Sequence, residues 1–217
     1  MGDPSGNCKS GNSQIPAINK ESPLIKRLIM PALVGFDEVL GNNGKLYLRL
    51  LVRLVDKSVS EYNIAKEYLD QEIKNGNKLD YGFIIINHLE NCINAINRVA
   101  KTFQSSMKVS NKIKDNDKLS KYLSKESIEN IEKFNTASIR NKVEHIDDDI
   151  QKGEFRGQLF LAVDNNYEKI CISNKSISLS DLVLIIESYR KAVLEIFDNL
   201  PNRLENGKYY HNDTLIQ

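Results

Sequence analysis

Three long segments carry apolar residues at alternating steps of four and three, the spacing of one helix face. They cover residues 45–75, 79–104 and about 180–200. Continuous seams of this kind favour helices packed at a shallow angle, as in a bundle. The seam positions are Leu48, Val52, Val55, Val59, Tyr62, Leu69 and Ile73 in the first, Gly82, Ile86, Leu89, Ile93, Ile96, Ala100 and Phe103 in the second, and Leu182, Ile186, Tyr189, Val193, Ile196 and Leu200 in the third.

A fourth helix is predicted from a cap at Ser124 or Ser127 to about residue 151. Its apolar residues between 139 and 150 form one stripe, and its polar residues lie on the other side. The stripe consists of Ile139, Val143, Ile146 and Ile150, and the polar face carries Arg140, Asn141, Glu144, His145 and Asp148. This helix would be held to a core while presenting groups with chemical capability.

Between the last two helices the apolar period shortens, which predicts a β-hairpin at about 157–174. The turn at 164–166, with its two asparagines, supplies a tolerant backbone. A short third strand is expected around Ile177 and Leu179, then a last helix capped by Ser180 and ended by Pro201.

The domain organisation follows from the flanking segments. Residues 1–22 are rich in Gly, Ser and Asn and predict a disordered tail. Residues 23–201 form one domain, with one or two short helical pieces at 24–40 and a turn at 41–44. Residues 202–217 predict a frayed polar tail. The fold class expected is mainly α, a four-helix bundle with N-terminal helical extras and a small hairpin between the last two major helices.

Composition adds limits on function. The chain has 217 residues, a net charge of +1 and 41% hydrophobic residues, which suits one soluble domain. Cys8, Cys92 and Cys171 are far apart and form no Cys-x-x-Cys motif, so neither a disulfide framework nor a zinc site is predicted. No apolar run approaches the roughly 20 residues of a membrane span. We therefore expect a cytoplasmic protein without membrane contact and without a cofactor.

Residues 105–125 lose the helical pattern and carry six lysines against two aspartates. This segment is either a solvated connection or an arm that contacts phosphate groups. Among the histidines, His211 lies in the tail and is given no role. His88 and Cys92 are one helical turn apart, but no orienting partner is evident, so a half-buried structural histidine is favoured over a nucleophile pair.

The carboxylates near the end of the fourth predicted helix do not predict a metal site. Asp147, Asp148 and Asp149 are consecutive, and consecutive helical side chains point about 100° apart. They cannot all reach one ion together with Glu144. We interpret them as a solvated helix end, although they oppose the helix dipole there.

Arg140 and His145 form an Arg-x4-His motif in which Asn141 follows the arginine. This resembles the signature of the HEPN superfamily, whose domains are helical bundles with the motif on an inner helix. The resemblance covers roughly residues 45–200. It implies a metal-independent endoribonuclease that acts as a homodimer with a composite site and leaves a 2′,3′-cyclic phosphate. It also suggests a toxin or defence effector with an antitoxin or regulatory protein as partner.

Each motif residue has an expected role under this resemblance. His145 would act as general base or acid at the ribose 2′-OH or the leaving oxygen. Arg140 would bind the scissile phosphate, and Asn141 would orient the imidazole or the RNA. Further contacts to the substrate are expected from Lys142, Glu144 and Asp148. Because Arg140 and His145 lie about 140° apart around one helix, activity should require a second copy.

The alternative is a non-catalytic HEPN-like helical module that binds a partner protein or a nucleotide. The acidic run and the near-neutral net charge favour this alternative, whereas His145 with Asn141 favours the ribonuclease. One toxin subgroup carries a modifiable Tyr two positions after the His. Asp147 stands there in this chain, so that mode of control is not expected.

Overall fold

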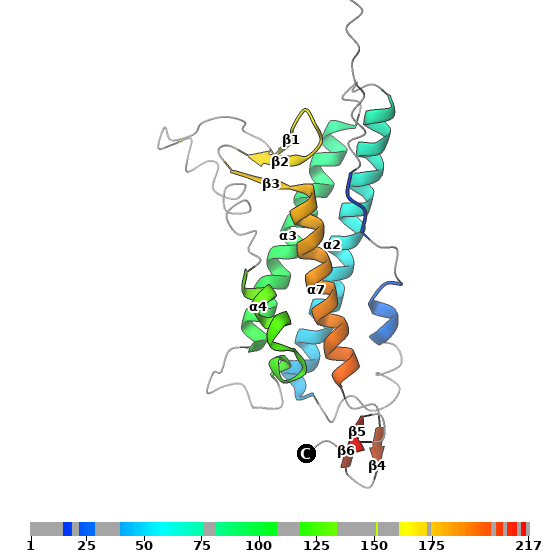
Figure 1. The fold of residues 1–217 in the computed structure, drawn as a ribbon, viewed down its shortest axis with the longest axis vertical. Helices are drawn as coiled ribbons and strands as arrows, with labels where there is room; N and C mark the ends of the chain where they lie inside the picture. The colour runs from blue at the N-terminus through cyan, green and yellow to red at the C-terminus, as the bar shows by residue number, and fades with distance from the viewer. Residues whose placement is uncertain are drawn as a thin grey trace, which may run out of the picture.

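The computed structural model describes residues 15–18, 22–28, 40–75, 81–107, 118–133, 151, 161–172 and 175–200, together with the backbone of 203–205, 208–211 and 214–215. The protein is mainly helical, with a small three-stranded antiparallel sheet near one end of the long helices (Figure 1). The helices are α2 (Asn42–Lys74), α3 (Gly82–Met107), the 3-10 turn η2 (Leu119–Tyr122), α4 (Lys125–Lys133) and α7 (Leu179–Asn199).

The helices α2 and α3 form an antiparallel pair. Antiparallel packing follows from two contacts, because Ser58 on α2 lies opposite Cys92 on α3 and Glu61 lies opposite His88. The buried face of α2 continues without a break in steps of four and three. One row of this face consists of Gly44, Leu48, Leu51, Val55, Ser58, Tyr62, Ala65, Leu69 and Glu72, and Val52 and Leu54 beside it are also buried. Of the predicted seam, Val59 and Ile73 are only half-buried and the other five positions are buried. Ala65 is buried where the predicted seam passes directly from Tyr62 to Leu69.

The buried face of α3 is wider than the predicted seam. Four of the predicted positions are buried, namely Leu89, Ile93, Ile96 and Phe103. A second row beside them is also buried, namely Ile85, Cys92, Ala95 and Val99. This width is needed because α3 contacts α2, α4 and α7. The ring of Phe103 stacks on Tyr189 of α7 with centroids 5.9 Å apart.

The last helix, α7, confirms its predicted seam, since all six positions are buried. Its predicted cap is wrong. Ser178, with extended backbone, is the N-cap, and its Oγ accepts a hydrogen bond from Asp181 N–H at 2.9 Å. Ser180 already lies inside the first turn, where a side chain cannot perform that function. The helix ends at Asn199, before Leu200 and Pro201.

The predicted hairpin is confirmed as β1 (Ala162–Val163) and β2 (Lys169–Ile172), which pair antiparallel. The third strand is β3 (Lys175–Ser178), with Ile170 opposite Ile177. Leu179, which was expected in this strand, is instead the first residue of α7. The residue of this turn with a positive φ is Tyr167, at 57°, and neither Asn165 nor Asn166 adopts that conformation. The Asp164 carboxylate stabilises this turn by accepting the N–H groups of Glu168 and Lys169 at 2.8 and 3.0 Å.

Both predicted tails differ from expectation where they are described. Ile15 and Ile18 are 5% and 4% exposed, and Pro16 O accepts the Tyr62 hydroxyl at 2.8 Å. Ile15 and Ile18 therefore belong to the core, since burial of two isoleucine side chains offsets the entropy lost when this segment is ordered. At the other end β4 (Arg203–Glu205), β5 (Lys208–His211) and β6 (Thr214–Leu215) form a small antiparallel sheet, so the frayed tail is wrong for these strands.

Two connecting segments also differ in structure from the prediction. The turn expected at 41–44 is the start of α2, with Gly41 as N-cap and Lys45 N–H bonded to its carbonyl at 3.1 Å. The lysine-rich segment is not entirely solvated, since Leu119 and Leu123 are 0% and 9% exposed. Its residues 108–117 lie outside the described ranges. Of the helical pieces expected at 24–40, the described part contains one turn at 25–28, and residues 29–39 lie outside the described ranges.

Candidate functional site

The predicted catalytic and substrate-binding residues lie outside the described residues. This applies to Arg140, Asn141, Lys142, Glu144, His145 and Asp148, and to the rest of the acidic run. Their roles stay predictions. The structure does describe α4, which immediately precedes this segment in the chain, and Gln151 just after it, which is helical.

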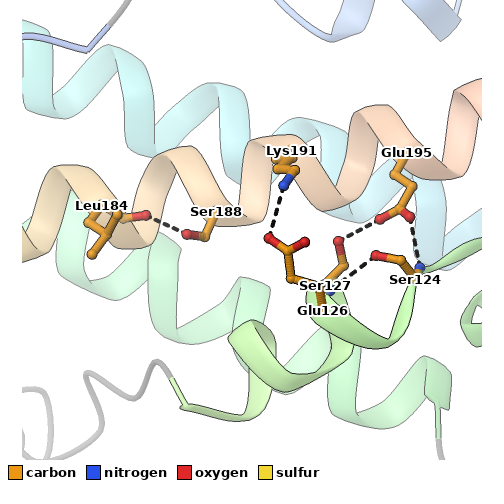
Figure 2. Close-up of polar contacts among 7 residues, drawn as sticks. All are labelled: Ser124, Glu126, Ser127, Leu184, Ser188, Lys191 and Glu195. Carbon is orange, nitrogen blue, oxygen red and sulfur yellow. Dashed lines mark hydrogen bonds and ion pairs between the residues drawn. The ribbon is translucent and has the colours of Figure 1, made fainter.

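The helix α4 is capped at its N-terminus by the side chain of Ser124. Ser124 Oγ accepts a hydrogen bond from Ser127 N–H at 3.2 Å, which confirms Ser124 as one of the two predicted caps. Glu195, from α7, accepts from Ser124 N–H at 2.8 Å and from Ser127 Oγ at 2.5 Å (Figure 2). One carboxylate thus holds the first turn of α4 against α7. Ser127 and Ile131 are buried on the same side of α4.

The electrostatics of this contact favour a charged carboxylate. Desolvation alone would raise the pKa of Glu195, but hydrogen bonds from Ser127 and Ser124 and the charge of Lys191 hold that pKa below its usual range. Lys191 also forms an ion pair with Glu126 at 3.2 Å, a second link between α7 and α4 (Figure 2). Within α7, Ser188 Oγ donates to the Leu184 carbonyl at 2.7 Å, a local bond that does not reach α4.

A second polar contact joins α2 and α3. His88 Nδ1 lies 2.6 Å from Glu61 Oε2, and the two side chains are 23% and 17% exposed. His88 is half-buried, as predicted, and its structural role stays a prediction. Glu61 is the orienting partner that the sequence did not reveal, because the two residues are brought together only by helix packing.

Cys92, next to this pair, is not an available nucleophile. Its side chain is 0% exposed, and its thiol donates to the Ser58 carbonyl at 3.4 Å. Burial, followed by the negative charge of Glu61, raises the pKa of the Cys92 thiol far above its ordinary value. The thiolate needed for nucleophilic attack is therefore not formed near neutral pH.

The burial of one acidic residue was not predicted from the sequence. Glu72 is 2% exposed at the end of the α2 seam and borders a cavity of about 360 Å³. The signal was present, since the steps of four and three through Tyr62, Ala65 and Leu69 lead to position 72. The apolar spacing instead predicts the neighbouring Ile73 as a seam position, and a carboxylate is rarely buried.

None of the helices in the described ranges is long and apolar enough to cross a bilayer. Within the same ranges, no three His, Cys, Asp or Glu side chains gather as metal ligands would. Comparison of the chain with models of protein families, with curated protein sequences and with solved structures finds no match.

Proposed function

We propose that this chain is a HEPN-like four-helix bundle that acts as a metal-independent endoribonuclease. The observation that carries the proposal is the Arg-x4-His spacing of Arg140 and His145, with Asn141 in the second position, on the polar side of a predicted helix. The bundle would comprise α2, α3, α7 and a fourth helix that starts with α4 and continues through the motif. Such a protein would serve as a toxin or defence effector in the cytoplasm, restrained by an antitoxin or regulatory protein.

The anchoring of α4 supports this arrangement. Glu195 and Lys191 tie its first turns to α7, and Ile131 buries its inner side. A helix held at its start can present residues further along in a defined orientation, which catalysis requires. The apolar stripe from Ile139 to Ile150 would extend the same packing.

The proposed chemistry is transesterification. His145 removes the proton from a ribose 2′-OH, the 2′-oxygen attacks phosphorus, and the 5′-oxygen of the next nucleotide leaves and takes up a proton. Arg140 stabilises the added negative charge on the phosphoryl oxygens. Asn141 orients the imidazole or the RNA, and Lys142, Glu144 and Asp148 contact the substrate. The products are a 2′,3′-cyclic phosphate and a 5′-hydroxyl.

The experiment compares the purified protein with His145→Ala and Arg140→Ala on structured and unstructured RNA, each with and without EDTA. Matched controls are His211→Ala and Arg98→Ala, because Arg98 is exposed on α3. We expect both motif variants to lose cleavage, the controls to retain it, and EDTA to have no effect. Cleavage that persists in both motif variants overturns the proposal.

The second candidate is a non-catalytic helical module that binds a partner protein or a nucleotide. It is favoured by adjacent apolar side chains at the start of α3, where Phe83 is 90% and Ile84 40% exposed. Under this candidate the wild type cleaves no RNA, and Phe83→Ser abolishes partner binding while His145→Ala does not. The two candidates therefore make opposite predictions for the wild type, because the first expects RNA cleavage and the second expects none.

A further inference from the structure

A cavity of about 360 Å³ lies where the end of α2, the start of α3 and the turn between β1 and β2 meet. Its walls include the aliphatic side chains of Leu69, Ile85 and Ile86. Its polar groups are few and include the side chains of Glu72, Asp164 and Tyr167. The space is half open to solvent and mainly apolar, and its volume falls in the range of small-ligand sites.

Glu72 is the unusual member of this lining. Its side chain is almost completely buried, and its Oε2 accepts the Tyr81 N–H at 3.1 Å, close to the start of α3. Its other oxygen, Oε1, is also buried and has no hydrogen-bond donor among the residues that the structure describes. A buried acceptor without a donor is strongly disfavoured unless another molecule supplies one.

The fold itself does not require a charge at this position. Position 72 continues a seam whose preceding members are Tyr62, Ala65 and Leu69, where an apolar side chain would pack. The single bond to Tyr81 N–H needs one oxygen, which a glutamine amide would provide equally well. The second carboxylate oxygen and the negative charge, which both oxygens share, therefore have no structural role in the contacts described.

The surroundings of Glu72 favour a positive charge in the cavity. Asp164 is a second acidic residue of the lining, although its Oδ1 already accepts the N–H groups of Glu168 and Lys169, and no described Lys or Arg belongs to the lining. Desolvation and then the negative charge of Glu72 raise the pKa of Tyr167, so its hydroxyl lies within the field of that carboxylate. An aromatic ring beside a carboxylate also suits an ammonium group.

We propose that this cavity binds a small primary amine with an apolar chain. The ammonium group donates to Glu72 Oε1, and the chain packs on Leu69, Ile85 and Ile86. The proposal is independent of the ribonuclease, because none of these residues belongs to the Arg-x4-His motif.

The test uses isothermal titration calorimetry with hexylamine and with hexan-1-ol, which has the same chain but no charge. The wild type is compared with Glu72→Gln, which keeps an acceptor for Tyr81 N–H, and with Glu67→Gln, a matched change at an exposed position on the same helix. Circular dichroism shows that each variant is folded. We expect hexylamine to bind the wild type and Glu67→Gln alike, and to bind Glu72→Gln at least about tenfold more weakly.

Three results overturn the proposal. In the first, hexylamine does not bind the wild type at millimolar concentration, or binds Glu72→Gln equally well. In the second, hexan-1-ol binds the wild type as tightly as hexylamine, which would mean that the site selects no charge. The third requires one more variant, Lys78→Met, because Lys78 follows Glu72 closely in the chain. If hexylamine binds Lys78→Met but not the wild type, the cation that pairs with Glu72 comes from the protein itself.

Discussion

Ser127 Oγ on α4 donates a hydrogen bond of 2.5 Å to Glu195 Oε2 on α7, so two segments far apart in the chain meet at the first turn of α4 (Figure 2). The other oxygen of Glu195 accepts the Ser124 N–H, one of the donors that a helix start leaves without an intrahelical partner. The contact lies just ahead of the segment that carries the Arg-x4-His motif. It therefore connects the stability of α4 with the proposed catalytic function.

Replacement of Glu195 by Ala should lower the free energy of unfolding by about 1 kcal/mol, because two hydrogen bonds to a partly exposed carboxylate are lost. Glu132→Ala is the matched control, since Glu132 is exposed on α4 and should change stability by less than about 0.5 kcal/mol. Urea denaturation at neutral pH measures both. Equal midpoints for the two variants would contradict the assigned role of Glu195.

The same contact predicts a pH dependence. The pKa of Glu195 is lowered in the folded protein, so its stabilisation is complete above the ordinary Glu pKa of about 4.3 and is lost as the pH falls through the lowered value. The difference in unfolding free energy between wild type and Glu195→Ala should therefore be constant from neutral pH to about pH 5 and shrink below about pH 4. A difference that grows on acidification would contradict the sign of this shift.

The cap of α7 can be tested by a pair of serine variants. Ser178→Ala should cost about 1 kcal/mol of stability, because the Asp181 N–H loses its acceptor. Ser180→Ala, two positions later and exposed, should be within about 0.5 kcal/mol of wild type. Thermal unfolding of both variants gives the comparison. A larger loss for Ser180→Ala would restore the cap that the sequence suggested.

The burial of Cys92 predicts its chemical behaviour. Iodoacetamide should label Cys171, which is half-buried, faster than Cys92 in the native protein. In denaturant the two thiols should react at similar rates, which serves as the internal control. Mass spectrometry of tryptic peptides measures both. Native labelling of Cys92 as fast as that of Cys171 would show that its surroundings open readily.

The proposed composite site predicts complementation between two inactive variants. If each site takes His145 from one copy and Arg140 from the other, a mixed dimer of the two alanine variants contains one intact site and one without either residue. Refolding the variants together in equal amounts should yield half mixed dimers. The RNA cleavage rate should then be about a quarter of wild type, whereas each variant alone stays inactive. An inactive mixture that contains mixed dimers would contradict pairing across the interface.

The sequence by itself determined the helices and strands that are marked by the spacing of apolar residues within one segment. The seam of α7 from Leu182 to Leu200 was predicted completely, and the hairpin and β3 were recognised by their period. Helical and strand periods are properties of neighbouring residues, so they can be read without knowing the partners. The Arg140, Asn141 and His145 motif is also local, and the structure leaves it a prediction.

The tertiary structure alone decided which side chains meet. Glu61 became the partner of His88, Glu195 became part of the cap of α4, and Ile15 became part of the core. Each pairing joins segments that are distant in the chain, and composition carries no signal for such contacts. Glu72 lies between these cases: its position continues the helical spacing of the α2 core face, but only the packing shows that its carboxylate is buried.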